Sequence, residues 1–198
     1  MSWSIEVNDG DPDGRDLDKA VKAAAEKGIL MFCSARDRGF NIQHTYPAKS
    51  TNNIFKIGAA DDFGDTDKRV GDKSLIDFTF PGSTEDLEGI RSFGSSVATA
   101  YASGLAALIL YCVQVRLFLK RTDEEKQKVR EQFEALKKHD KMDRTFKYTI
   151  GVADAGANGN KFVQVWDMFG DVRSKKDKYP DKLLEIIGRV GEKLCARV

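Results

Sequence analysis

The chain has few of the residues that hold small or metal-dependent proteins together. Three cysteines, four prolines and two histidines occur among its 198 residues. The cysteines, Cys33, Cys112 and Cys195, lie far apart and are odd in number, which argues against a disulfide framework and against a closed zinc site. We therefore expect reduced structural thiols and no metal or cofactor, and we favour an intracellular location.

The chain also lacks an excess of charge and a secretion signal. Its formal net charge is +1, which indicates no strongly charged partner. The charge is unevenly spread, because residues 1–119 carry −4 and residues 120–198 carry +5. Met1–Glu6 runs directly into acidic residues without the basic and apolar regions of an export signal.

Two charged segments resemble binding motifs only in part. The basic run Arg173–Lys176 has no aromatic residues between its charges, so we expect no nucleic-acid partner. Asp9, Asp11 and Asp13 are spaced like the start of a calcium loop, but Ala20 stands where the closing glutamate is needed. Calcium at these aspartates is left as a minor alternative.

The first third of the chain has the pattern of an α/β protein. Met1–Val7 resembles the end of a strand, a helix with apolar residues on one face ends at Gly28, and Ile29–Ser34 is a continuous apolar run. Strand, helix and strand with short connections predict a βαβ unit. Such sheets bind ligands at the carboxyl ends of their strands, which directs attention to residues 35–39.

A glycine and two serines lead into a long run without charge, from Phe93 to Val115. Ser96 would lie in the first turn of a helix, where a hydroxyl meets unpaired backbone N–H groups and the positive end of the helix dipole. This is a suitable place for a nucleophile whose attack produces an oxyanion. A buried helix capped by serine is the alternative. Polar residues such as Ser103 and Gln114 argue against a membrane span.

The sequence of residues 94–99, Gly-Ser-Ser-Val-Ala-Thr, resembles the Gly-Thr-Ser-Met-Ala-Thr signature of subtilisin-like serine proteases, the subtilase family. Residues 33–39 resemble the family's Ala-Ala-Ala-Gly-Asn-Glu-Gly segment. Residues 46–61 resemble its Tyr-Pro followed by the Val-Gly-Ala-Val-Asp strand, and residues 77–82 its Ala-Pro-Gly turn. Residues 1–4 match its substrate-lining strand. The resemblance covers about residues 1–119 and implies the carboxyl-terminal part of a catalytic domain.

The resemblance assigns roles to individual residues. Ser96 takes the place of the nucleophile, and Asp37 occupies the oxyanion-hole position, where the family has an asparagine. An ionised carboxylate there would oppose the developing negative charge. The residues implied in substrate binding are Ser2, Trp3, Ser4, Ser34, Ala35 and Arg36.

The family's catalytic Asp and His have no counterpart in the chain. They precede every matched segment, and neither His44 nor His139 has the family's His-Gly context. The resemblance implies a serine-type endopeptidase that forms an acyl-enzyme on Ser96, present here as a fragment, with a peptide or protein substrate and an amino-terminal segment of the same protein as a possible partner. The alternative is a non-catalytic protease relic that binds peptides or a partner.

The expected fold is an incomplete three-layer α/β sandwich with a mainly parallel sheet, followed by a small α+β extension at residues 120–198. In that extension we predict a charged helix over residues 123–138 and a hairpin formed by residues 146–152 and 162–166. An amphipathic helix over residues 181–195 follows.

Overall fold

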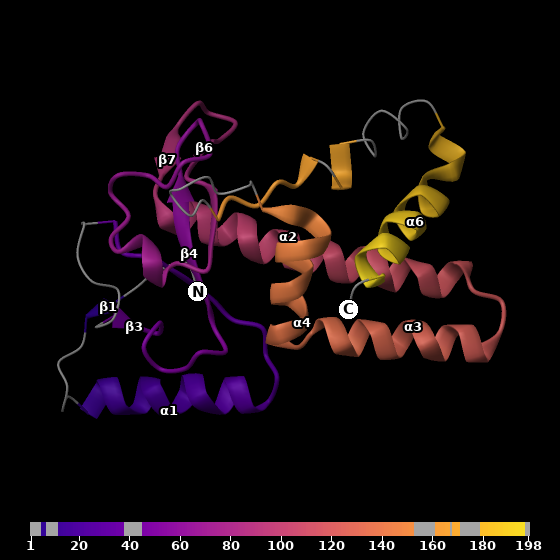
Figure 1. Cartoon of the computed structure of the whole chain (residues 1–198), viewed down its shortest axis with the longest axis horizontal. Coiled ribbons are helices and arrows are strands. Elements are labelled where there is room, and N and C mark those ends of the chain that lie inside the picture. The colour runs from indigo at the N-terminus through magenta and orange to yellow at the C-terminus, as the bar shows by residue number, and fades with distance from the viewer. Residues whose placement is uncertain are drawn as a thin grey trace. The chain divides into compact units, whose positions relative to one another are not determined.

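The structure of the chain is a computed structural model. The chain forms two compact units, residues 1–104 with 153–162 and residues 105–152 with 163–198. One long helix, α2, begins in the first unit and continues into the second (Figure 1). The domain boundary predicted after residue 119 stays a prediction. The structure describes residues 5–6, 12–37, 45–152, 161–166, 168–170 and 179–196.

The first unit is built on a three-stranded parallel sheet. Its strands lie in the order β2 (Phe32–Ser34), β4 (Phe55–Ala60) and β5 (Phe78–Pro81). The rings of Phe32 and Phe55 stack at 5.0 Å between neighbouring strands. Nearly all of these strand residues are buried, as expected for apolar runs covered on both faces. The predicted α/β class is therefore confirmed, with a small parallel sheet and several helices.

The prediction of a βαβ unit at the start of the chain is wrong for its first strand. Helix α1 covers Pro12–Glu26, and Gly28, where the helix was predicted to end, follows it with a φ of 68°. Strand β1 (Ile5–Glu6), however, pairs antiparallel with β3 (Thr45–Tyr46) and stays outside the three-stranded sheet. An apolar pattern identifies a strand but does not determine its pairing partner.

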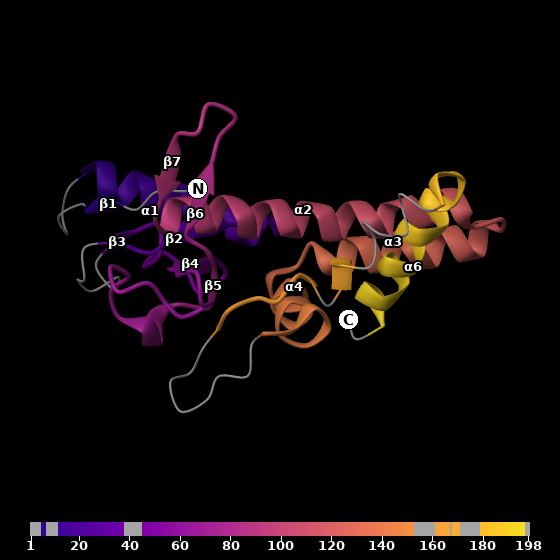
Figure 2. The same cartoon turned by 90° about the horizontal axis from the view of Figure 1, so that it is seen from above.

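A hairpin separates the sheet from α2. Strands β6 (Ser83–Glu85) and β7 (Arg91–Phe93) pair antiparallel, and the hairpin projects from the first unit in both views (Figures 1 and 2). At its tip the Asp86 carboxylate accepts hydrogen bonds from the backbone N–H groups of Glu88 and Ile90. The tip thus ends in an aspartate-stabilised turn that leads back towards α2.

Helix α2 spans Ser95–Leu119. It is the one helix among the described residues that is long and apolar enough to cross a membrane. Length and composition are weak indications, because the core helix of a soluble protein passes the same test and 44% of this apolar window is buried. The residues of its buried face include Ala98, Ala102, Ala106, Ile109 and Val113.

The second unit is helical in its described residues. Helix α3 (Asp123–Leu136) confirms the predicted charged helix and starts with a capping box between Thr122 and Glu125. At Gly188 and Gly191 of helix α6 a Cβ atom would meet α2, so the absence of side chains at these glycines lets the two helices approach closely. The remaining elements are α4 (His139–Arg144), the π-helix η3 (Thr145–Gly151), the short η4 (Pro180–Lys182) and α6 (Leu183–Cys195).

The prediction of a hairpin formed by residues 146–152 and 162–166 is wrong for the first strand. Residues 145–151 form the π-helix η3, and only Val152 and Val163 form an antiparallel bridge. Phe146 and Ile150 are both buried and stand four residues apart. Two apolar residues at this spacing lie on the same face of a helix and also on the same face of a strand, so the pattern fits both structures. The predicted hairpin tip at residues 153–160 lies outside the described residues.

Candidate functional site

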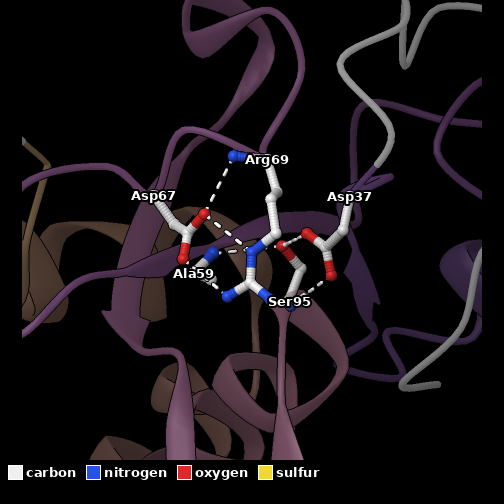
Figure 3. A network of polar contacts seen from close by, with 5 residues as sticks. All are labelled: Asp37, Ala59, Asp67, Arg69 and Ser95. Atoms are coloured by element: carbon white, nitrogen blue, oxygen red, sulfur yellow. Dashed lines mark hydrogen bonds and ion pairs between the residues drawn. The ribbon is translucent and has the colours of Figure 1, made fainter.

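Three segments meet where the strands of the parallel sheet end. Asp37 follows the carboxyl end of β2, Ala59 stands at the end of β4, and Gly82 follows β5. The amino-terminal turn of α2 starts at Ser95 and hydrogen-bonds to two of these segments (Figure 3). The carboxyl edge of a parallel sheet is the usual place of a functional site in α/β proteins, so this junction is the candidate site.

Ser95 is the centre of the junction. Its backbone N–H donates to Oδ2 of Asp37 at 2.7 Å, and its hydroxyl donates to Oδ1 of the same carboxylate at 2.6 Å. The Ser95 hydroxyl also accepts a hydrogen bond from the backbone N–H of Ala59 at 3.1 Å. Ser95 is completely buried. The Asp37 carboxylate therefore satisfies the start of α2, where the helix dipole favours negative charge.

Two glycines, Gly82 and Gly94, allow the segments of this junction to approach one another closely. Gly94 has a φ of 115°, a backbone conformation that side chains disfavour, and a Cβ atom there would collide with Oδ2 of Asp37. Its N–H donates to the carbonyl oxygen of Gly82 at 2.7 Å. A Cβ at Gly82 would lie 2.6 Å from that of Ala59. The backbone thus fits here only without side chains at these two positions.

A salt bridge lies beside the Asp37–Ser95 pair. Arg69 donates to the Asp67 carboxylate through Nε at 3.0 Å and Nη2 at 2.7 Å (Figure 3). These hydrogen bonds raise the pKa of Arg69, and the negative charge of Asp37 raises it further. The Asp67 N–H also donates to the carbonyl oxygen of Ala59 at 2.9 Å. The loop carrying this salt bridge is thus tied to β4 and is electrostatically coupled to Asp37.

Ser96 differs from its neighbour because its side chain is exposed. It occupies the first turn of α2, as predicted, beside a serine whose hydroxyl is already bonded to Asp37. The two adjacent serines therefore separate two tasks: Ser95 fixes the turn, and Ser96 presents a hydroxyl to solvent near the positive end of the dipole. Its role as nucleophile stays a prediction.

The remaining residues predicted for the site are those assigned to substrate binding and calcium binding, together with His44. Ser34 and Ala35 are buried, and the Ala35 N–H donates to the carbonyl oxygen of Ile57, which extends the pairing of β2 with β4. Arg36 is half-buried in the same loop as Asp37. Ser2, Trp3, Ser4, Asp9, Asp11 and His44 lie outside the described residues.

The calcium site considered at Asp9, Asp11 and Asp13 is described by the structure only at Asp13. Asp13 lies in the first turn of α1 and is exposed. In the part of the chain that the structure describes, no group of three or more His, Cys, Asp or Glu side chains could hold a metal ion. The expectation of no metal or cofactor stays a prediction.

Sequence analysis missed Ser95, Asp67, Arg69 and the glycine at position 82. Two adjacent serines after a glycine at a helix start were one available signal, since one of them could be expected to cap the helix through its side chain. The Asp67–Arg69 pair gave no comparable signal, because an acidic and a basic residue two positions apart are common on protein surfaces.

No protein-family model matches the chain, and no curated protein matches it. Solved structures with a similar fold include the prenylagaramide maturation protease PagA, with 17% identity and a TM-score of 0.54, and a lanthipeptide protease, with 18% identity and a TM-score of 0.56. The alignments cover 83% and 84% of this chain but only 57% and 58% of those proteins. The chain thus spans somewhat more than half of their length and shares their fold.

These findings correct the assignment made from the sequence. The fold is shared with a maturation protease and a lanthipeptide protease, and no family model supports membership of the subtilisin-like serine proteases. The endopeptidase function derived from that membership is withdrawn with it. The short motif is explained by packing: Gly94 is needed for its φ value, Ser95 for its bonds with Asp37, and Ala98 for its place in the core.

Proposed function

We propose that this chain is part of a peptide-processing protease, a protein that binds peptides and hydrolyses peptide bonds, and that the first turn of α2 meets the substrate. One arrangement carries the proposal: the exposed Ser96 follows a buried serine fixed to Asp37 at the carboxyl edge of the sheet. The fold shared with the prenylagaramide maturation protease and the lanthipeptide protease supports the same substrate class.

The helix dipole explains why this turn suits a peptide. A peptide carbonyl carries partial negative charge on its oxygen, and this charge grows when the carbon is attacked. The amino-terminal turn of α2 provides a positive end, where the Asp37 carboxylate accepts the backbone N–H of the buried Ser95. We propose Ser96 as the hydroxyl nearest the bound carbonyl, and Ser34–Arg36 together with Ser2–Ser4 as flanking contacts.

Hydrolysis needs a further group. A serine hydroxyl becomes a nucleophile through an adjacent base. His139, the histidine that the structure describes, begins α4. Binding of a peptide does not require that base, so binding can be measured separately from cleavage.

Peptide binding is therefore the test of the proposal. The full chain is irradiated with a mixture of unstructured peptides that carry a photoreactive group, and the crosslinked residues are identified by mass spectrometry. We expect crosslinks at the first turn of α2 and at Arg36 and Asp37, which are partly exposed. Ser96→Arg should abolish them, because a long charged side chain blocks the turn. Gln127→Arg introduces the same side chain at an exposed position of α3 and should leave them intact.

The same samples report cleavage. We expect peptides to be bound but not cut by this chain alone, because the base is not among the described residues near Ser96. Crosslinks that lie elsewhere, or that survive Ser96→Arg, would overturn the proposed site. Cleavage that persists in Ser96→Ala would show that a group other than Ser96 acts on the peptide.

A further inference from the structure

One face of α2 is uncovered over about five helical turns, from Ala100 to Phe118. Its exposed residues recur every three or four positions, so they form a single stripe along the helix. The stripe belongs to one continuous helix (Figures 1 and 2). The residues of the α2 stripe are Ala100, Tyr101, Ser103, Gly104, Ala107, Leu108, Tyr111, Gln114 and Phe118.

The α2 stripe has the composition of an interface. It carries no charged residue, although the side chains of Tyr111 and Phe118 are 54% and 81% exposed. The exposed face of α3 is different, with acidic and basic residues along its whole length. A soluble helix normally exposes a charged face, so a contiguous uncharged stripe with large apolar side chains indicates a surface that another element covers.

The spacing of the stripe indicates that a helix covers it. Ala100, Ala107 and Gln114 are seven residues apart, and so are Gly104, Tyr111 and Phe118. Two such series, offset by three or four positions, form the seam along which helices pack side by side in a coiled coil. A strand or a loop would not match this repeat.

The sizes of the side chains indicate which helix it is. Apart from Tyr101, small residues occupy the amino-terminal half of the stripe, at Ala100, Gly104 and Ala107. Large ones stand in the carboxyl-terminal half, at Tyr111 and Phe118. A second α2 lying antiparallel places the large half of one helix on the small half of the other. Nothing lies within 4 Å of a Cβ placed at Gly104, so the space opposite this residue is open. A parallel pair would instead oppose tyrosine to tyrosine and leave a gap at the glycine.

We propose that two copies of this chain associate through their α2 stripes, packed antiparallel around a two-fold axis near Ala107 and Leu108. The interface is self-complementary, as two-fold symmetry requires. The antiparallel arrangement also opposes the two helix dipoles favourably.

The area is sufficient for such a pair. Aromatic side chains bury about 150–250 Å² each, so the exposed fractions of Tyr101, Tyr111 and Phe118 leave roughly 400 Å² to be covered per copy. With the smaller residues, the two copies together approach the roughly 1,200 Å² at the lower end of specific interfaces. Interfaces at this lower end are typical of weak and transient complexes, so we expect reversible association in the micromolar range.

Sedimentation equilibrium of the full chain tests the proposal. We expect reversible dimers at concentrations up to about 100 μM. Gly104→Leu should weaken association by about tenfold or more, because it fills the space that the tyrosine of the second copy occupies. Lys128→Leu adds the same side chain to the exposed face of α3 and should have no effect. Non-specific apolar association would instead be strengthened by both variants.

Cysteine crosslinking tests the orientation. Under mild oxidation Leu108→Cys, close to the axis, should form an intermolecular disulfide, whereas Phe118→Cys, far from it, should not. A monomer throughout the concentration range, stronger association in Gly104→Leu, or crosslinking through position 118 would each overturn the proposal. Binding of the monomer to phosphatidylcholine vesicles would also overturn it and would identify lipid as the covering partner.

Discussion

Replacing Ser95 by alanine tests whether the candidate site is organised as the structure has it. The substitution removes one hydroxyl from the completely buried junction. Two hydrogen bonds are lost with it, the 2.6 Å bond to the Asp37 carboxylate and the 3.1 Å bond from the Ala59 N–H. The bond from the Ser95 N–H to Asp37 remains.

The expected loss follows from these two bonds. A hydrogen bond to a charged group contributes about 1.5–3 kcal/mol, and a buried N–H left without an acceptor costs about 1–3 kcal/mol. Ala59 is buried, so water does not readily replace the serine. Since the two effects share one group and are not additive, we expect Ser95→Ala to destabilise the first unit by about 2–4 kcal/mol.

Native-state hydrogen exchange of the β4 amides is the appropriate assay, because it reports the stability of the first unit separately from the second. A loss of about 2–4 kcal/mol accelerates exchange by roughly 30- to 700-fold. The matched control is Ser96→Ala, which removes the same atom from the exposed neighbour and should change stability by less than about 0.5 kcal/mol. Equal acceleration in both variants, within about threefold, would refute the assigned hydrogen bonds.

Three further predictions concern positions around and beyond this junction. Gly94→Ala should destabilise the first unit by at least about 2 kcal/mol, because Gly94 has a φ of 115° and a Cβ there would collide with Asp37. Gly104→Ala, at an open helical position, should be neutral or stabilising by up to about 1 kcal/mol. Hydrogen-exchange rates of the β4 and α2 amides measure both changes in stability. The hydrogen bond from Arg69 lowers the pKa of Asp67 below its ordinary value of 3.8, so their salt bridge stabilises the fold above that pH and the contribution is lost as the pH falls through the folded pKa. Acid unfolding followed by circular dichroism should therefore show a weaker pH dependence below about pH 4 in Asp67→Asn, and an unchanged profile would contradict this assignment. Burial raises the pKa of Cys33 to about 12 and that of Cys112 to about 11, so both thiols should react with iodoacetamide at neutral pH only after unfolding; rapid labelling of the native protein would contradict their burial.

Local sequence patterns determined most of the individual elements. The strongly charged stretch at residues 123–138 predicted the helix that the structure has at Asp123–Leu136. The apolar run ending at Ser34 predicted the buried strand β2, and the uncharged run after Gly94 predicted α2 with Ser96 in its first turn. Such patterns suffice because helix and strand periodicity is set by residues within a few positions of one another.

Where one local pattern fitted two structures, the sequence did not determine the outcome. Phe146 and Ile150 are compatible with a strand and with a helical turn, and burial of both against the second unit selects the π-helix. The family assignment failed in a similar way, because small residues around a helix start satisfy the packing needs of this junction as well as a catalytic signature.

The tertiary structure alone decided how the site is assembled. Asp37 and Ser95 are 58 residues apart, and only the parallel sheet brings the end of β2 next to the start of α2. The sequence placed a serine at the positive end of the helix but did not show which of the two would be buried. That choice depends on the direction from which the Asp37 carboxylate and the Ala59 N–H approach the first turn. Contacts of this kind are set by long-range packing, so no pattern within a single segment encodes them.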